Sequence, residues 1–460
     1  MVAGLIRGAV AAAVAVFYRL ERRGPAVPPG GVLIAANHPN SLMDPLVLYR
    51  TAGRNARPLA KAPLFRKRVV GPIIRALGGI PVYRRQDDPG QMERNEDTFR
   101  AAIEALLNGE AIQIFPEGRS HSDPALSPLR TGAARIGLAA EAAGAWCAGI
   151  RIVPVGLTFE RKPFFRGRAM ALYGEPIAVA EYRAAHERDP HDAARRLTAE
   201  LERRLHALTL NLTEARDGEL IDAAERLWAR EKGLHGFRET APLADRLPRL
   251  QAFARGLAWL RARDPNRFAD LARRVRGYQR KARVLGAGEG EVPDRYRLRP
   301  TLRWGATRVL PAVLLAPVAA IGVVAWWIPY RLVGAVVARM RMPTDVIATY
   351  KLGAALVAMP LFLVLWGGLV ARVWGAFPAA VAVVALPLIG VLTIRWWDGA
   401  RAAAEDIRLF GRVAARPHRL ERLAAERRDL VAAIDDVRRL AEAEAPQAVE
   451  RPGGVTGPSA

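Results

Sequence analysis

Cysteine is nearly absent from the chain, which has Cys147 as its single thiol among 460 residues. One thiol forms neither an internal disulfide nor a multi-cysteine metal site, so a disulfide framework is excluded. The apolar neighbours of Cys147 predict that it is a packing residue in a reduced compartment. No run of His, Cys and carboxylate residues has zinc-ligand spacing, and we expect neither a metal nor an organic cofactor.

The sequence signals of two function classes are also missing. The chain has no Gly-x-Ser-x-Gly elbow and no base near Cys147 in the sequence, so covalent catalysis through an acyl-enzyme is poorly supported. It has no RNA-binding aromatic signature, so nucleic-acid binding rests on charge alone. The 69 Lys and Arg against 45 Asp and Glu give a net charge of +24, which suits anionic lipid and phosphorylated substrates equally well.

Two short polar runs each follow a strand-like apolar segment. Residues 37–44 follow the segment 31–37, and residues 115–120 follow the segment 111–115. In α/β sheets the loops at the carboxyl ends of strands gather into sites. The two runs therefore predict a catalytic cleft.

The first run contains a base and a carboxylate. His38 has the intrinsic pKa of a general base, and Asp44 would orient its ring as in a Ser-His-Asp arrangement whose serine is replaced by the substrate hydroxyl. Five residues separate the two, which puts them on different faces of a regular helix, so the segment must bend. Asp44 followed by Pro45 predicts an N-cap and the first helical residue. The structural alternatives are a pure N-cap and a loop histidine.

Four blocks in the chain resemble the glycerolipid acyltransferase superfamily, whose members move a fatty acyl group from a thioester to glycerol phosphates or lysophospholipids: residues 38–44, 78–85, 115–120 and 152–157. The resemblance covers roughly residues 28–180. It implies an α/β fold with a twisted mixed sheet flanked by helices, and His38 with Asp44 as the catalytic pair. The substrate-binding residues that it implies, with forked Arg donors for a phosphate, are Lys61, Arg84, Glu117, Gly118, Arg119 and Ser120.

Two alternatives stay open for these binding residues. In a chain this basic, any one cation is by default a solvated surface charge, and Arg85 and Arg130 are the most exposed to that objection. Glu117 either binds substrate or pairs with Arg84 or Lys61 to shape the turn, and we assign it to binding.

The spacing within the blocks points to one branch of the superfamily. Five residues rather than four separate His38 from Asp44, and Arg119 follows the Phe-Pro-Glu-Gly turn directly. Both features resemble the fungal type of glycerol-3-phosphate and dihydroxyacetone-phosphate acyltransferase and its bacterial relatives. In those proteins a membrane-embedded part follows the catalytic domain.

The residue pattern divides the chain into six regions. We expect a membrane-interface helix at 1–27 (the alternative is a secretory signal), an acyltransferase domain at 28–185, a helical extension at 186–300, a membrane-embedded region at 301–400, a cytoplasmic helical hairpin at 401–445 and a disordered tail at 446–460.

Three apolar segments approach the length that spans a bilayer: 309–330, 352–370 and 376–394. Three prolines interrupt the first segment, which we therefore predict to be a re-entrant or interfacial hairpin. The other two would form a spanning hairpin around an outer turn near Gly375. This arrangement keeps both basic flanks in the cytoplasm.

Together these features predict a membrane-bound O-acyltransferase of phospholipid synthesis, in the bacterial inner membrane with its catalytic domain facing the cytoplasm. The donor would be acyl-CoA or acyl-acyl-carrier protein, and the acceptor glycerol-3-phosphate or a lysophospholipid such as lysophosphatidate. Membrane lipids are expected partners and nucleic acid is not. The alternatives are a catalytically inactive lipid-binding or scaffolding protein of the same fold, and an RNA-binding protein.

Overall fold

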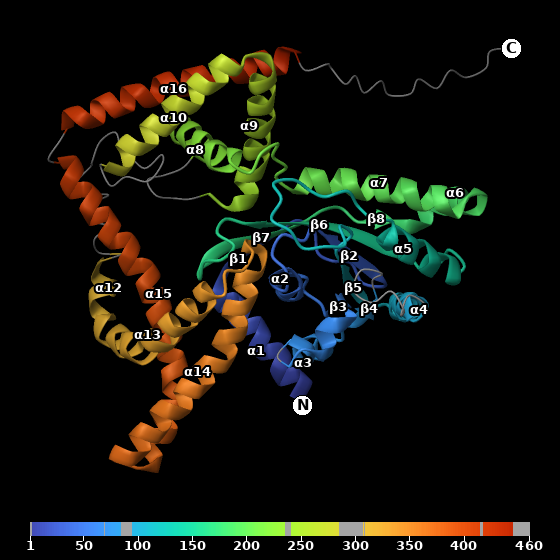
Figure 1. The fold of residues 1–460 in the computed structure, drawn as a ribbon, viewed down its shortest axis with the longest axis horizontal. Coiled ribbons are helices and arrows are strands. Elements are labelled where there is room, and N and C mark those ends of the chain that lie inside the picture. Colours follow the sequence, from blue (N-terminus) through green and yellow to red (C-terminus); the bar gives the residue numbers. More distant parts are fainter. Residues whose placement is uncertain are drawn as a thin grey trace. The chain divides into compact units, whose positions relative to one another are not determined.

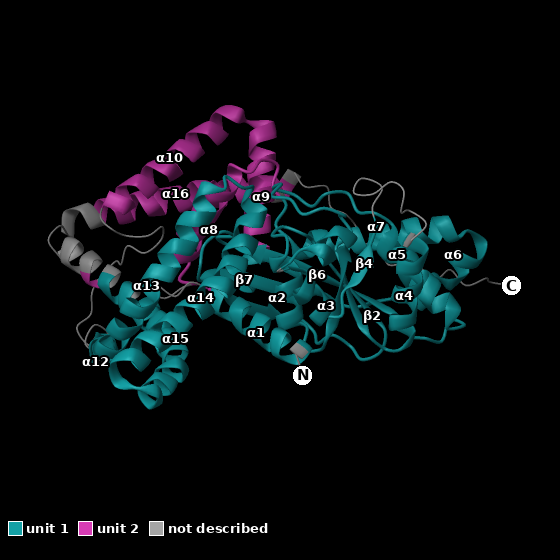
Figure 2. Cartoon of the chain, turned by 60° about the horizontal axis from the view of Figure 1, so that its bottom comes forward, with its two compact units in different colours: residues 1–211, 242–247, 298–404 teal, residues 212–241, 248–297, 405–460 magenta. Residues whose placement is uncertain are grey.

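The computed structural model describes residues 2–68, 70–83, 94–234, 241–284, 307, 309–414 and 417–444. The chain divides into two compact units (Figure 2). Unit 1 comprises residues 1–211, 242–247 and 298–404, and unit 2 comprises residues 212–241, 248–297 and 405–460.

Unit 1 is built on one mixed sheet, as the sequence predicted. Its strands run in the order β1-β7-β6-β2-β5-β3-β4, and β8 also pairs with β6. All these pairs are parallel except β6 with β7 and β6 with β8. The bounds are β1 Tyr18–Arg23, β2 Val32–Ala36, β3 Ala56–Lys61, β4 Ile80–Val82, β5 Ala111–Ile114, β6 Arg151–Phe159, β7 Gly167–Tyr173 and β8 Ile177–Ala178.

Helices cover both faces of this sheet (Figure 1). Their bounds are α1 Val2–Phe17, α2 Met43–Thr51, η1 Ala62–Arg66, α3 Val70–Ala76, α4 Arg94–Leu107, α5 Gly132–Ala143, η3 Val179–Tyr182, α6 Arg183–Arg188 and α7 Pro190–Leu208. Alternate residues of β2 point to opposite faces: Ile34 packs with α1 and α2, whereas Leu33 packs with α4, α5 and α7. Because β2 is buried on both faces, its sequence is apolar throughout.

The N-terminal helix is part of this core. Val10 and Val14 of α1 are buried in the cluster that includes α2, and β1, which follows α1, pairs with β7 along the sheet edge. Leu5, near the start of α1, is 73% exposed. The contact of α1 with a membrane surface stays a prediction.

Four further helices of unit 1 or beginning in it carry the apolar segments: α12 Leu310–Leu314, α13 Ala316–Arg339, α14 Thr344–Trp374 and α15 Ala376–Ala414. Residues 316–339, 344–374 and 376–401 are each long and apolar enough to cross a membrane. Gly375, with φ of 90°, separates α14 from α15 at the predicted turn. Glycine suits that turn because a side chain is strained in this conformation.

The first apolar segment contacts the two helices that follow it. Near its start, the Trp396 indole N–H of α15 donates to the Ala312 carbonyl. Met340, which follows α13, lines the same cavity as His38. In its middle, the Ala325 carbonyl accepts the Trp366 indole N–H of α14. The re-entrant or interfacial course of this segment in a membrane stays a prediction. The prolines do not break it into separate arms, however, because one helix runs through Pro329.

Unit 2 contains a helical cluster. Its elements are α8 Asp217–Glu231, most of α9 Leu243–Arg263, α10 Pro265–Val284 and α16 Pro417–Glu444. Leu227, Tyr278 and Leu430 contribute to a core shared by α8, α10 and α16. The 401–445 segment was predicted to be a hairpin, and its second helix, α16, packs on α8 and α10. The predicted tail at 446–460 lies outside the described residues.

Cys147 is exposed, so the prediction that it packs in the interior is wrong. A tight turn follows α5, in which Ala145 and Trp146 both have positive φ, of 53° and 61°. This turn carries the thiol to the surface although its sequence neighbours are apolar.

Candidate active site

The first polar run leaves the middle of the sheet. Asn37 directly follows β2, and its side-chain amide continues the pairing of β2 with β6. The Nδ2 group donates to the Leu157 carbonyl at 3.0 Å, and Oδ1 accepts from the Leu157 N–H at 2.7 Å. The backbone of His38 is therefore held close to the carboxyl end of β2 although His38 lies outside the strand.

His38 and Asp44 lie in direct contact, as their spacing and chemistry predicted. The His38 Nδ1 atom is 2.8 Å from Asp44 Oδ2. The imidazole stacks on the Phe115 ring, with centroids 4.1 Å apart and planes inclined by 17°. An Nδ1–H that donates to Asp44 leaves the lone pair on Nε2, and no described residue hydrogen-bonds to that atom. The His38 side chain is 17% exposed.

The prediction that Asp44 is the N-cap of the following helix is wrong. Helix α2 begins at Met43 after Leu42, so Asp44 lies within its first turn. The chain reverses at Ser41, which has φ of 48°. This reversal lets Asp44 Oδ2 accept the Asn40 N–H at 2.7 Å in addition to the contact with His38. The bend that the five-residue spacing required is therefore present. The Asp44 side chain, however, accepts a backbone N–H of the preceding loop rather than one of the helix.

Asp44 is fully buried, at 0% exposure. Burial raises the pKa of Asp44 above its usual range, while the hydrogen bond and charge of His38 and the Asn40 N–H pull it down. Its other oxygen, Oδ1, has no hydrogen-bond partner among the described residues. The carboxylate thus contacts His38 in a buried environment of low dielectric constant. Its interaction with an imidazolium is strong there because little solvent screens the two charges.

Glu117 holds the two polar runs together. One carboxylate oxygen accepts the His38 N–H at 2.7 Å, and the other accepts the Ser127 N–H at 2.7 Å. That second oxygen also lies 2.5 Å from His121 Nε2. The side chain is buried, and within the described part of the chain it hydrogen-bonds to these groups rather than to Lys61. Binding of substrate by Glu117 stays a prediction.

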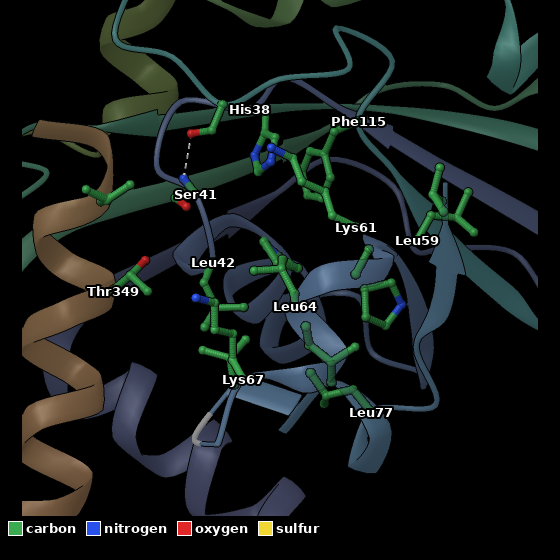
Figure 3. A pocket seen from close by; sticks show the side chains of 18 of the residues that line it. His38, Ser41, Leu42, Leu59, Lys61, Leu64, Lys67, Leu77, Phe115 and Thr349 are labelled. Carbon is green, nitrogen blue, oxygen red and sulfur yellow. Dashed lines mark hydrogen bonds between the residues drawn. The ribbon is translucent and has the colours of Figure 1, made fainter. Parts of the chain in front are cut away.

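A cavity of about 1230 Å³ opens beside His38. Figure 3 shows His38, Phe115 and Lys61 gathered at one end, with Leu64, Leu77 and Lys67 further along. Of the predicted binding residues, three line this cavity: Lys61, Gly118 and Ser120. Arg119 does not line it: its side chain is 60% exposed, and its guanidinium group pairs with Asp123 at 2.8 Å. Arg84 and Arg85 lie outside the described residues.

Arg130, rather than Arg119, lies beside the turn at Gly118. Its side chain lies over Gly118, where an added Cβ would meet the Arg130 Nε atom at 2.8 Å. Arg130 lines the cavity, and no carboxylate in the described part of the chain is paired with it or with Lys61. The surface-charge interpretation of Arg130 underestimated its proximity to the site.

Three further polar residues near the site were not predicted from the sequence: Asn37, Lys162 and Asp345. Burial lowers the pKa of Lys162, against the attraction of nearby carboxylates that include Asp44 and Asp345. Asp345, at the start of α14, accepts the Ser120 hydroxyl at 2.9 Å. Asn37 alone carried a signal, since it is a polar residue between an apolar strand and His38. Asp345 carried none, because it is distant in the sequence.

Comparison with known proteins bears on this site. Residues 19–158 match the family model for acyltransferases. Glycerol-3-phosphate O-acyltransferase 2 of Saccharomyces cerevisiae is 30% identical over 43% of this chain and 26% of its own length. Glycerol-3-phosphate O-acyltransferase 1 of the same yeast is 25% identical over 39% of this chain and 23% of its own. The crystal structure of the 1-acyl-sn-glycerophosphate acyltransferase PlsC from Thermotoga maritima is 20% identical, covers 45% of this chain and 79% of that one, and has a TM-score of 0.34.

The family match identifies residues 19–158 as an acyltransferase domain. With the two yeast relatives, it supports the resemblance of this domain to the glycerolipid acyltransferase superfamily that the four sequence blocks indicated. The chain spans about a quarter of the length of the yeast proteins.

Proposed function

We propose that the protein is an O-acyltransferase of glycerolipid synthesis that moves a fatty acyl group from a thioester to glycerol-3-phosphate or lysophosphatidate. The observation that carries the proposal is the contact of His38 Nδ1 with the buried Asp44 carboxylate, beside a cavity in an acyltransferase domain. A donor of either kind, acyl-CoA or acyl-acyl-carrier protein, supplies the thioester.

The reaction needs a base because a hydroxyl is a poor nucleophile near neutral pH. His38 Nε2 accepts the proton of the acceptor hydroxyl as its oxygen attacks the thioester carbonyl. Asp44 stabilises the imidazolium that forms. As the carbon–sulfur bond breaks, the imidazolium returns the proton to the leaving thiolate, so a free thiol and an ester are released and His38 is neutral again.

The cations beside the turn supply the affinity for a phosphate-bearing acceptor. Lys61 and Arg130 line the cavity, and their charge-assisted hydrogen bonds are about twice as strong as neutral ones. We assign them, with the predicted Arg84, to the acceptor phosphate. Glycerol-3-phosphate is the acceptor that we favour, because it is the acceptor in the names of both yeast relatives.

The apolar helices supply the membrane attachment. We place the protein in the bacterial inner membrane with the acyltransferase domain on the cytoplasmic side, where acyl thioesters are made. Three helices long and apolar enough to cross a bilayer support the attachment. The orientation rests on the basic residues that flank these helices.

The test is an assay of the purified full chain with labelled acyl-CoA or acyl-acyl-carrier protein and a panel of acceptors. We expect an ester product with glycerol-3-phosphate or lysophosphatidate that disappears in His38→Ala, while the variant keeps its melting temperature and its membrane fraction. A wild-type chain that binds lipid but forms no ester with any acceptor would favour the inactive scaffolding alternative.

A further inference from the structure

The cavity beside His38 has one wall that does not come from the acyltransferase domain. On one side it is lined by apolar residues of the loop before α2 and of α3, such as Leu42, Ile74 and Leu77. On the other side lie the end of α13 and the first half of α14, which carries Thr349 in Figure 3. Ser120 and Lys61 lie at the His38 end, and Lys67 lies further along the cavity (Figure 3).

The contribution of α14 follows one face of the helix. The lining residues recur at intervals of three and four, which places them in one stripe: Val346, Thr349, Tyr350, Gly353, Ala354 and Val357. Eleven helical steps correspond to a wall about 16 Å long. We call this stripe the α14 wall.

The α14 wall is fixed to the catalytic turn at its polar end. The Ser120 hydroxyl donates to Asp345 at 2.9 Å, and its oxygen accepts the Ser41 N–H at 2.9 Å. Two residues further along, the Ser122 and Thr344 hydroxyls lie 2.9 Å apart. The first turn of α14 is therefore in hydrogen-bond contact with the loops that carry His38.

The next turns of α14 are held as well. The Lys351 ammonium group donates to the Pro163 carbonyl at 2.7 Å, in the loop that follows β6. These contacts set both the distance and the rotation of the α14 wall relative to His38.

We propose that the α14 wall holds the fatty acyl chain of the donor, and that Gly353 sets how long a chain fits. This inference rests on the proposed acyl transfer. The α14 wall is apolar from Gly353 to Val357 and starts beside the turn that carries Ser120. A fatty acyl thioester, whose apolar chain begins at a reactive carbonyl, fits both features. Because α14 is also long and apolar enough to cross a membrane, the wall continues from the reaction centre into apolar surroundings.

Gly353 is the position on this wall that a side chain would change most simply. A Cβ added there would meet no heavy atom within 4 Å, so a larger side chain enters open space rather than displacing a neighbour. It lies eight residues beyond Asp345, about 12 Å along the helix axis. A short acyl chain would end before Gly353, whereas a long one would pass it.

The same helix offers a matched control. Gly368 also lies in α14, an added Cβ there also meets no heavy atom within 4 Å, and it does not line the cavity. Gly353→Phe and Gly368→Phe therefore add the same side chain to the same helix, and only the first enters the cavity. Gly353→Leu is a smaller second variant in case the phenyl ring hinders folding.

The experiment measures kcat/KM of the purified full chain with acyl-CoA donors of eight to eighteen carbons. We expect Gly353→Phe to lower the ratio of the sixteen-carbon to the eight-carbon value about tenfold or more, and Gly353→Leu to lower it less. Gly368→Phe should keep the wild-type ratio. An unchanged ratio in both Gly353 variants, or an equal change in Gly368→Phe, would overturn the proposal.

A binding measurement separates this proposal from the proposed function. Non-hydrolysable thioether analogues of the same chain lengths are titrated into wild type and variants, without an acceptor. Selective loss of sixteen-carbon affinity in Gly353→Phe supports the α14 wall even if no acceptor is ever esterified. Equal affinities of wild type, Gly353→Phe and Gly368→Phe for every length refute the wall, even if acyl transfer is observed.

Discussion

Replacement of Asp44 by Asn tests the catalytic pair most directly. The amide oxygen can still accept from His38 Nδ1 and from the Asn40 N–H, so the change removes the charge and preserves most of the geometry. Two unit charges about 4 Å apart interact with about 4 kcal/mol at the effective dielectric constant of 20 that suits protein sites. Loss of that stabilisation from the transition state corresponds to about a thousandfold lower kcat.

The assay should detect the ester product itself. Cys147 is exposed and would react with thiol reagents, so a thiol-release assay needs a Cys147→Ser background. Asp97→Asn, at an exposed carboxylate of α4, is the matched control and should keep full activity. A loss of less than tenfold in Asp44→Asn would refute the role of Asp44 in stabilising the imidazolium.

The same variant makes a prediction about stability and pH. A carboxyl group whose pKa is raised in the folded protein favours folding at acid pH, and this contribution is lost as the pH rises through the folded pKa. Asparagine does not titrate. The melting temperature of Asp44→Asn minus that of wild type should therefore increase from acid to neutral pH, and a decrease over that range would contradict the raised pKa.

Three further predictions follow from the site, the sheet and the apolar helices. Lys61→Met should raise the KM for glycerol-3-phosphate about tenfold or more and leave that for the donor unchanged, with Arg100→Met on α4 as the control; equal effects on both substrates would contradict phosphate binding. Gly156→Ala, whose Cβ would lie 2.0 Å from the Leu208 carbonyl oxygen, should destabilise the fold by about 1–3 kcal/mol in denaturant unfolding, and Gly132→Ala, with open space around it, should not; equal midpoints would refute the packing argument. In the Cys147→Ser background, cysteine at Gly375 should be labelled from outside intact cells and cysteine at Arg339 should not; the reverse pattern would invert the proposed orientation.

The sequence was most informative where strands are apolar on both faces. β2 and β5 are buried throughout and β6 is buried from Ile152 to Leu157, so these runs stand out from their surroundings. Two strands were missed for identifiable reasons. β1 is a charged edge strand, and β3 contains Pro58, which usually argues against a strand inside a sheet. The Gln113 side chain of β5 donates to the Ala56 carbonyl of β3, an interaction that no local pattern encodes.

The contact between His38 and Asp44 was predictable because both residues lie in one short loop with a required bend. The residues that surround them were less so. Asp345 reaches Ser120 from 225 residues further along the chain, and only the tertiary fold brings them together. The sequence favoured Arg119, which lies in one of the four family blocks, over Arg130. Their different placements follow from the tight turn at Gly118, with φ of 75°, which directs Arg119 toward solvent and leaves room for Arg130.

The amide of Asn37 lets the backbone leave the sheet before the sheet's hydrogen bonding ends. A side-chain amide has the same donor and acceptor as a peptide group, so Asn37 substitutes for one more residue of β2 opposite Leu157. Aspartate at this position would have an acceptor but no donor, and leucine would have neither. The main chain is thereby free to bend at His38 without an unpaired strand end, and the position of the base depends on a residue that takes no part in the chemistry.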